Sequence, residues 1–138
     1  MSALLDTSVV VRYLTGDPPE LAERAAQVLD REAVALTPLV LAEAAYVLTK
    51  VYGVPRAAAV DALIQLLQKE NVDLLDLSKE AAIVALLFAR PSGRVSFTDA
   101  LIWAEAREKR LPVYTFDQRF PAGEVEVRVL GGGACARP

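Results

Sequence analysis

Two acidic residues of this 138-residue chain directly follow short apolar segments. Asp6 comes after residues 3–5 and Asp117 after residues 113–116, so each acid stands where a predicted strand ends. In parallel α/β sheets, ligands bind at the carboxyl ends of the strands. Both carboxylates are therefore candidates for a common site, although Asp6 also suits a helix N-cap and Asp117 an ordinary turn.

A third acid, Glu43, lies in a predicted helix and has apolar neighbours. Such a helix face is not typically solvated, and burying an unpaired carboxylate costs several kcal/mol. The sequence therefore predicts that Glu43 points inward, toward either an arginine partner or a metal ion. The residues three and four positions away are Leu39, Val40, Tyr46 and Val47.

The fourth acid, Asp99, follows Ser96 at the start of a predicted helix. By itself this position is typical of a cap or of a charge that stabilises a helix N-terminus. Together the four acids indicate a cation site, because neighbouring carboxylates repel one another unless a cation neutralises them. Oxygen ligands without histidine or cysteine suit Mg²⁺ or Mn²⁺, and Mg²⁺ favours phosphoryl-transfer or phosphodiester chemistry.

The composition excludes several other kinds of chemistry. The chain has no histidine, which rules out Ser-His-Asp catalysis, the usual catalytic zinc sites and histidine phosphotransfer. Its single cysteine, Cys135, excludes a disulfide framework, so we expect a cytoplasmic protein. The net charge of −3 argues against a general nucleic-acid binder. Setting aside the four candidates, however, leaves 14 of the 18 acids against 15 basic residues.

Turn residues and apolar periodicity predict one domain over residues 1–130 and a flexible tail over residues 131–138. Strands that alternate with helices favour parallel pairing, so we expect a three-layer α/β/α sandwich with a mainly parallel five-stranded central sheet. The predicted strands are 3–5, 33–36, 72–75, 112–116 and 125–130. The predicted helices are 7–16, 18–31 with Asp17 as its N-cap, 37–53, 55–70, 79–90 and 98–110.

No membrane segment is expected from the sequence. The longest unbroken apolar run, residues 81–89, has about half the length that a membrane-spanning helix needs. The first residues lack the basic region of a signal peptide. Because 54% of the residues are apolar, we expect the surplus to cover a dimer or partner interface.

The order of these residues resembles that of the PIN-domain ribonucleases. The matching features are Asp6-Thr7-Ser8 after a strand, Glu43 on an apolar helix, and the segments 98–104 and 114–120. In length and spacing the chain is similar to the VapC-type toxins of bacterial and archaeal toxin–antitoxin systems, over residues 2–130. The resemblance implies a Mg²⁺- or Mn²⁺-dependent endoribonuclease, for which we expect a metal-activated water that leaves a 5′-phosphate and a 3′-hydroxyl.

The resemblance also assigns site residues. It implies that the family's four acidic residues, which are catalytic and bind metal, correspond here to Asp6, Glu43, Asp99 and Asp117. Hydroxyls that hydrogen-bond the carboxylates or their waters correspond to Thr7, Ser8 and Thr115. Many relatives carry an acid or an asparagine shortly after the fourth acid, where this chain has Gln118 and Arg119. That departure leaves the number of metal ions open.

The partners expected are RNA, an antitoxin protein and a second copy of the chain. Residues 44–67 form a predicted helical hairpin that suits a homodimer face and an antitoxin groove, or ordinary core packing. The alternatives are a PIN-like module that binds RNA or protein without cutting, and an aspartate-dependent phosphohydrolase, which Ser8 disfavours because that class needs a second aspartate there. Candidate phosphate contacts, each equally consistent with plain surface solvation, are Arg12, Arg90, Arg94 and Arg119.

Overall fold

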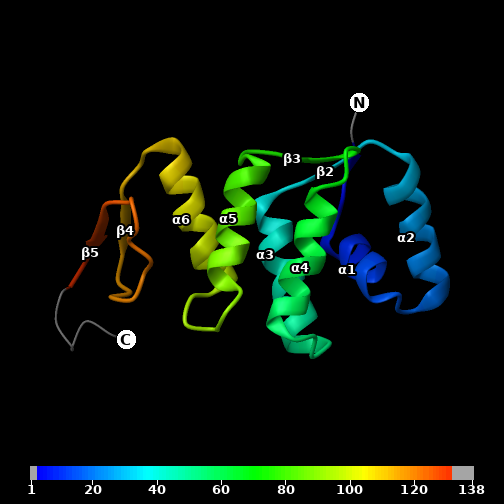
Figure 1. Ribbon diagram of the computed structural model, residues 1–138, viewed down its shortest axis with the longest axis horizontal. Helices are drawn as coiled ribbons and strands as arrows, with labels where there is room; N and C mark the ends of the chain where they lie inside the picture. Colours follow the sequence, from blue (N-terminus) through cyan, green and yellow to red (C-terminus); the bar gives the residue numbers. More distant parts are fainter. Residues whose placement is uncertain (1–2, 132–138) are drawn as a thin grey trace.

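A computed structural model describes residues 3–131, with short strands alternating with helices (Figure 1). This arrangement confirms the predicted α/β class. The elements are β1 (Ala3–Leu4), α1 (Thr7–Thr15), α2 (Pro19–Arg31), β2 (Val34–Leu36), α3 (Pro38–Tyr46), the π-helical turn η1 (Val47–Val51), α4 (Arg56–Leu67), β3 (Val72–Leu74), α5 (Lys79–Ala89), α6 (Phe97–Lys109), β4 (Val113–Thr115) and β5 (Val127–Val129).

The strands form two separate sheets, so the prediction of one five-stranded sheet is wrong. The first sheet has the order β1-β2-β3 and the second consists of β4 and β5. Every pairing is parallel, as predicted, with Ala3 opposite Val34 and Val113 opposite Val127. Figure 1 shows α5 and α6 between the two sheets. The segment between β4 and β5 is tied to α6, because Trp103 Nε1 donates to the carbonyl of Gly123 at 2.8 Å and Arg107 pairs with Glu124 at 3.0 Å.

The helices bury the central strand of the larger sheet. Val34 and Leu36 of β2 are fully buried, because β2 has a strand on either side and lies under helices. The buried apolar side chains form a continuous core, while others, such as Leu39 and Val51, are exposed. The large side chains that are almost fully buried are Val10, Leu29, Val34, Leu36, Leu41, Val60, Leu63, Leu66, Leu67, Val72 and Leu86.

Side-chain caps explain where several helices begin. Thr37, Ser78 and Ser96 each accept a hydrogen bond from a backbone N–H in the first turn of the helix that follows. Asp17 does not act in this way: the N-cap of α2 is Pro18, which has no side-chain cap. The helix that we predicted over residues 37–53 is divided in the structure. Its α-helical part, α3, ends at Tyr46, and the wider π-helical turn η1 continues it to Val51.

Two further predictions concern the limits of the chain and the membrane. Residues 132–138, most of the predicted tail, lie outside the described residues. The single domain over residues 1–130 stays a prediction. Within residues 3–131, no helix combines the length and the apolar character needed to cross a membrane.

One partly buried arginine fixes the start of α6. The Arg56 guanidinium, at the first position of α4, donates from Nε to the carbonyl of Ala89 at 2.5 Å and from Nη2 to the carbonyl of Val95 at 2.6 Å. It also lies 4.0 Å from the centroid of the Phe97 ring. Burial lowers the pKa of Arg56. This clamp holds the loop between α5 and α6, and α6 in turn carries Asp99.

Replacing Arg56 with leucine removes both hydrogen bonds and leaves two carbonyls without their donor. We expect a loss of about 2–4 kcal/mol in the free energy of unfolding, measured by urea denaturation. The control is Arg24→Leu on the exposed face of α2, which we expect to change stability by less than about 0.5 kcal/mol. Equal effects of the two substitutions contradict the clamp.

Candidate functional site

Asp6, Thr7 and Ser8 form the junction between β1 and α1. Asp6 caps α1, since its Oδ1 accepts a hydrogen bond from the Thr7 amide at 2.9 Å. Its Oδ2 accepts a hydrogen bond from the Ser8 hydroxyl at 2.8 Å. The capping role that the sequence allowed for Asp6 is therefore real, and the carboxylate stays exposed. A cap on the surface remains available to an incoming ligand.

Thr7 links this junction to Glu43. Its side chain is buried, and its Oγ1 donates a hydrogen bond to Oε1 of Glu43 on α3. The hydroxyl therefore fixes the orientation of one carboxylate oxygen and leaves the other free. Asp6 and Glu43, distant in sequence, form the first acid pair of the site, which we name the β1 pair.

The environment of Glu43 differs from the prediction. The residue is exposed, and two of its apolar neighbours are exposed as well: Leu39 to 75% and Tyr46 to 60%. The expected inward direction of Glu43 is therefore wrong. The neighbours are apolar because α3 presents apolar side chains to solvent, and periodicity alone does not separate such a face from a core face.

Asp99 and Asp117 form a second acid pair, which we name the β4 pair. Asp99 lies in the first turn of α6, which Ser96 caps, and the Asp99 amide donates to Ser96 Oγ at 3.0 Å. Burial raises the pKa of Asp99, the negative charge of Asp117 raises it further, and a hydrogen bond from Ser96 opposes the rise. The two carboxylates are thus close enough to repel each other, the condition under which a cation is bound.

The turn after β4 fixes Asp117 locally. Its amide donates to Thr115 Oγ1 at 3.0 Å, and its Oδ1 accepts a hydrogen bond from the Arg119 amide at 2.8 Å. Asp117 therefore does serve as a turn residue. Thr115 holds the backbone of Asp117, whereas the sequence led us to expect a hydrogen bond to a carboxylate or a water.

The two pairs do not merge into one cluster. In the described part of the chain, no group of three acidic or cysteine side chains is placed to hold a metal ion. The oxygen donors suit Mg²⁺ or Mn²⁺ chemically.

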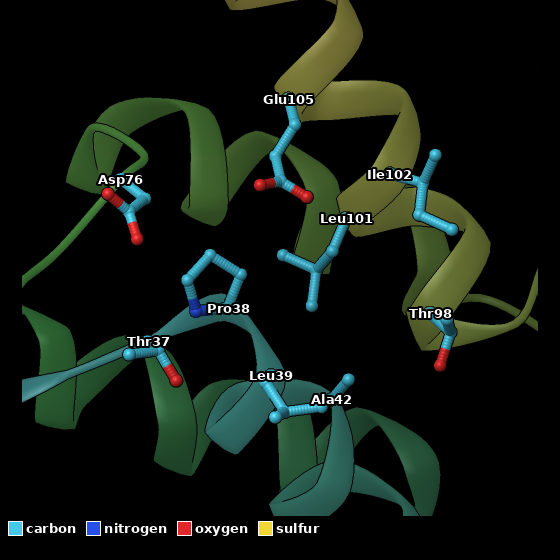
Figure 2. Close-up of a pocket in the computed structure, with 9 residues that line it drawn as sticks. All are labelled: Thr37, Pro38, Leu39, Ala42, Asp76, Thr98, Leu101, Ile102 and Glu105. Atoms are coloured by element: carbon cyan, nitrogen blue, oxygen red, sulfur yellow. The ribbon is translucent and has the colours of Figure 1, made fainter. Parts of the chain in front are cut away.

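A cavity that the sequence did not reveal lies between α3 and α6. Its volume is about 340 Å³, and Figure 2 shows Asp76 and Glu105 near one end and Thr98 near the other. Glu105 of α6 lines this cavity. The lining residues are Thr37, Pro38, Leu39, Ala42, Asp76, Thr98, Leu101, Ile102 and Glu105.

The four candidate arginines have different surroundings. Arg94 and Arg119 line one cavity of about 530 Å³, together with Phe88 and residues of the loop before α6. Arg90 donates to both carboxylate oxygens of Asp61, at 2.9 and 2.8 Å. Arg12 donates to the carbonyl of Ser8 at 3.4 Å, and its Nε is buried with no partner among the described residues. Only Arg94 and Arg119 thus share an accessible hollow.

Comparison with known proteins identifies the family. A family model described as the PIN domain matches residues 3–124, a span that contains all four acids. This match confirms the resemblance at the level of the family. No curated protein matches the chain.

Replacement of Asp99 by asparagine tests the repulsion within the β4 pair. Because the pKa of Asp99 is raised in the native state, the native protein holds more protons than the unfolded chain between about pH 3.9 and that raised pKa. The free energy of unfolding therefore falls as the pH rises through this window. We expect Asp99→Asn to be more stable than wild type at pH 7 in EDTA, with a gain that shrinks as the pH approaches 4.

Urea denaturation at several pH values measures this effect. The control is Asp73→Asn, which removes an exposed carboxylate from β3. A stability gain for Asp99→Asn that does not depend on pH excludes charge repulsion as its cause.

Proposed function

Because the chain belongs to the PIN-domain family of nuclease modules, we propose that it is a metal-dependent endoribonuclease that uses Asp6, Glu43, Asp99 and Asp117. The observation that carries this proposal is the family match over residues 3–124, which spans all four acids. The raised pKa of Asp99 beside Asp117 supports it, because neighbouring carboxylates of this kind attract a divalent cation.

The available donors favour a hard cation. With no histidine in the chain, the carboxylates and hydroxyls supply only oxygen ligands, which suit Mg²⁺ or Mn²⁺. Such an ion, when bound, activates water and polarises a phosphodiester. The protein's own groups orient the carboxylates: Thr7 holds Glu43, Ser8 holds Asp6, and Thr115 holds the backbone of Asp117.

Arg94 and Arg119 are the proposed contacts for RNA phosphates. Both are exposed and line the same cavity, so two arginine side chains border one hollow. Arg119 follows Asp117 by two residues and Arg94 precedes Asp99 by five. Arg90 is excluded from this role because both of its contacts go to Asp61.

The finer proposal is that the protein is the toxin of a type II toxin–antitoxin system. The resemblance in length and spacing supports it, as do exposed apolar side chains where the hairpin of residues 44–67 turns: Tyr46, Val51 and Tyr52. The buried residues of the hairpin belong to the core. A neighbouring reading frame for a small DNA-binding protein supports the toxin, and its absence favours a stand-alone role in RNA processing.

A second candidate function has one specific observation in its favour. Since no three acids of the described residues converge, a PIN-like module that binds RNA without cutting it is consistent with the separated pairs. The same cleavage experiment distinguishes the two functions.

The nuclease proposal is tested with structured RNA and Mg²⁺. We expect wild-type protein to cut internally, EDTA to abolish cleavage, and Asp6→Asn or Asp117→Asn to lower the rate by at least about 100-fold. The matched control, Asp73→Asn, removes a carboxylate outside the site and keeps its rate. Wild-type binding without cleavage establishes the non-cutting module, and undiminished cleavage by Asp6→Asn removes these acids from the mechanism.

The RNA contacts are tested by the double substitution Arg94→Ala with Arg119→Ala. We expect weaker binding of single-stranded RNA, and a salt dependence that is shallower by about 1.4 in the slope of log K against log salt. Arg24→Ala with Arg31→Ala removes the same charge from α2 and serves as the control. Identical salt slopes for the two double variants rule out a specific role for Arg94 and Arg119.

A further inference from the structure

One hollow of this protein, which we name the loop cavity, is lined by the end of α5, the loop before α6 and the turn after β4. Its volume of about 530 Å³ lies within the range of about 300–1,000 Å³ that is typical of small-molecule sites. Its lining combines two arginines with an aromatic ring and smaller side chains. The lining residues are Phe88, Pro91, Ser92, Arg94, Val95 and Arg119.

The two arginines of the loop cavity are not engaged by acidic side chains. Within residues 3–131, neither the Arg94 nor the Arg119 guanidinium forms an ion pair, because the ion pairs of that part of the chain use four other cations. Only the backbone amides of the two residues donate hydrogen bonds there, to Ser92 Oγ and Asp117 Oδ1. Two exposed guanidinium groups at one hollow attract an anion, and the planar guanidinium fork matches the oxygens of a phosphate.

Phe88, near the end of α5, supplies the aromatic surface of the loop cavity. Its ring lies against the ring of Trp103, with 5.4 Å between the two centroids and 39° between the two planes. The Phe88 side chain nevertheless stays 46% exposed. An aromatic ring that is held by a neighbour and still has an exposed surface provides a platform on which a nucleobase stacks, and such stacking tolerates any base.

The walls of the loop cavity are fixed by contacts from outside it. The Arg56 guanidinium donates to the carbonyls of Ala89 and Val95, which bracket the loop between α5 and α6. The turn that carries Arg119 is fixed by the hydrogen bond from its amide to Asp117. Because both segments are held in place without a ligand, a ligand that binds between them offsets little ordering of the chain.

We propose that the loop cavity binds one nucleotide, whose base stacks on Phe88 and whose phosphate is held by Arg94 and Arg119. An exposed aromatic ring alone suits many apolar ligands, and two arginines alone suit many anions. Their combination in one cavity selects a ligand with both a flat aromatic part and a phosphate, and a nucleotide has both.

The nucleotide has two possible sources, because an RNA chain and a free nucleotide share the same base and phosphate. We assign it to RNA, since Arg119 follows Asp117 by two residues and Arg94 precedes Asp99 by five. The base is then an unpaired one, because the faces of a paired base are covered by its neighbours in the helix. The assignment to RNA rests on the proposed function, whereas the nucleotide site rests on the cavity alone.

Binding of adenosine 5′-monophosphate tests the site without any cleavage of RNA. Trp103 is the only tryptophan of the chain and lies against Phe88, so its fluorescence reports a base that stacks there. We expect a saturable change in this fluorescence with adenosine 5′-monophosphate. In calorimetry, ribose 5-phosphate, which lacks the base, is expected to bind at least about 5-fold more weakly. Absence of binding, or equal affinities for the two ligands, overturns the proposal.

Substitutions at Phe88 separate stacking from packing. We expect Phe88→Ala to bind adenosine 5′-monophosphate at least about 5-fold more weakly and ribose 5-phosphate as wild type does, and Phe88→Tyr to restore the affinity. Phe88→Leu keeps an apolar side chain beside Trp103 and is expected to show the same selective loss. Calorimetry measures all these affinities, because a change at Phe88 alters the fluorescence of Trp103 by itself.

The matched control is Leu87→Ala, which removes a similarly exposed side chain of α5 that does not line the loop cavity, and we expect it to bind both ligands as wild type does. Arg94→Ala with Arg119→Ala is expected to weaken the binding of both ligands, because both contain the phosphate. Wild-type affinity for adenosine 5′-monophosphate in Phe88→Ala or Phe88→Leu protein with a native circular dichroism spectrum contradicts stacking on Phe88.

Competition with RNA identifies the source of the nucleotide. We expect a short single-stranded RNA to displace adenosine 5′-monophosphate, and the same RNA annealed to its complement to need at least about 5-fold higher concentrations. Retention of the mononucleotide against both RNAs makes a free nucleotide the occupant and overturns the assignment to RNA. If the mononucleotide binds while wild-type protein cuts no RNA, the nucleotide site stands and the proposed function fails. If RNA is cut while the mononucleotide does not bind, the nucleotide site fails and the proposed function stands.

Discussion

Repulsion between carboxylates is the constraint on which this structure depends. Asp99 and Asp117 are near enough for one charge to raise the pKa of the other, and partial burial adds to the cost. The surrounding groups fix the positions of the acids without neutralising them, since they are hydroxyls and backbone amides rather than arginines or lysines. The protein thereby keeps two neighbouring negative charges at Asp99 and Asp117, although their repulsion lowers its stability. Such retained charge is typical of a binding site.

Local features of the fold were predictable from sequence because their causes are local. Ser78 and Ser96 cap helices through contacts to the following turn, and short apolar runs between helices indicated parallel strands. The division of the strands into two sheets was not predictable, because the alternation of strands and helices determines the direction of pairing but not which strands are neighbours. The exposure of Glu43 was not predictable either, because its neighbours Leu39 and Tyr46 are apolar residues that nevertheless lie exposed to solvent.

In the candidate site, too, the features with local causes were predictable from sequence and those with long-range causes were not. The sequence indicated four acids and their order, because strand ends and helix starts are readable from pattern. It did not separate Arg90, which is bound to Asp61, from Arg94, which is exposed, because the partner of Arg90 lies 29 positions away. Nor did it reveal Arg56, whose hydrogen bonds to two distant carbonyls depend on how α4, α5 and α6 pack. Long-range contacts assign these arginines their roles.

The π-helical turn η1 has a consequence for how this chain tolerates changes in length. It follows α3 directly, one turn beyond Glu43, and a π turn holds more residues than an α-helical turn. Deleting one residue there converts it to a regular helical turn, because the wider turn accommodates one extra residue. Glu43 precedes the turn and keeps its position. Insertions and deletions in the connection to α4 can therefore accumulate during evolution without moving this carboxylate.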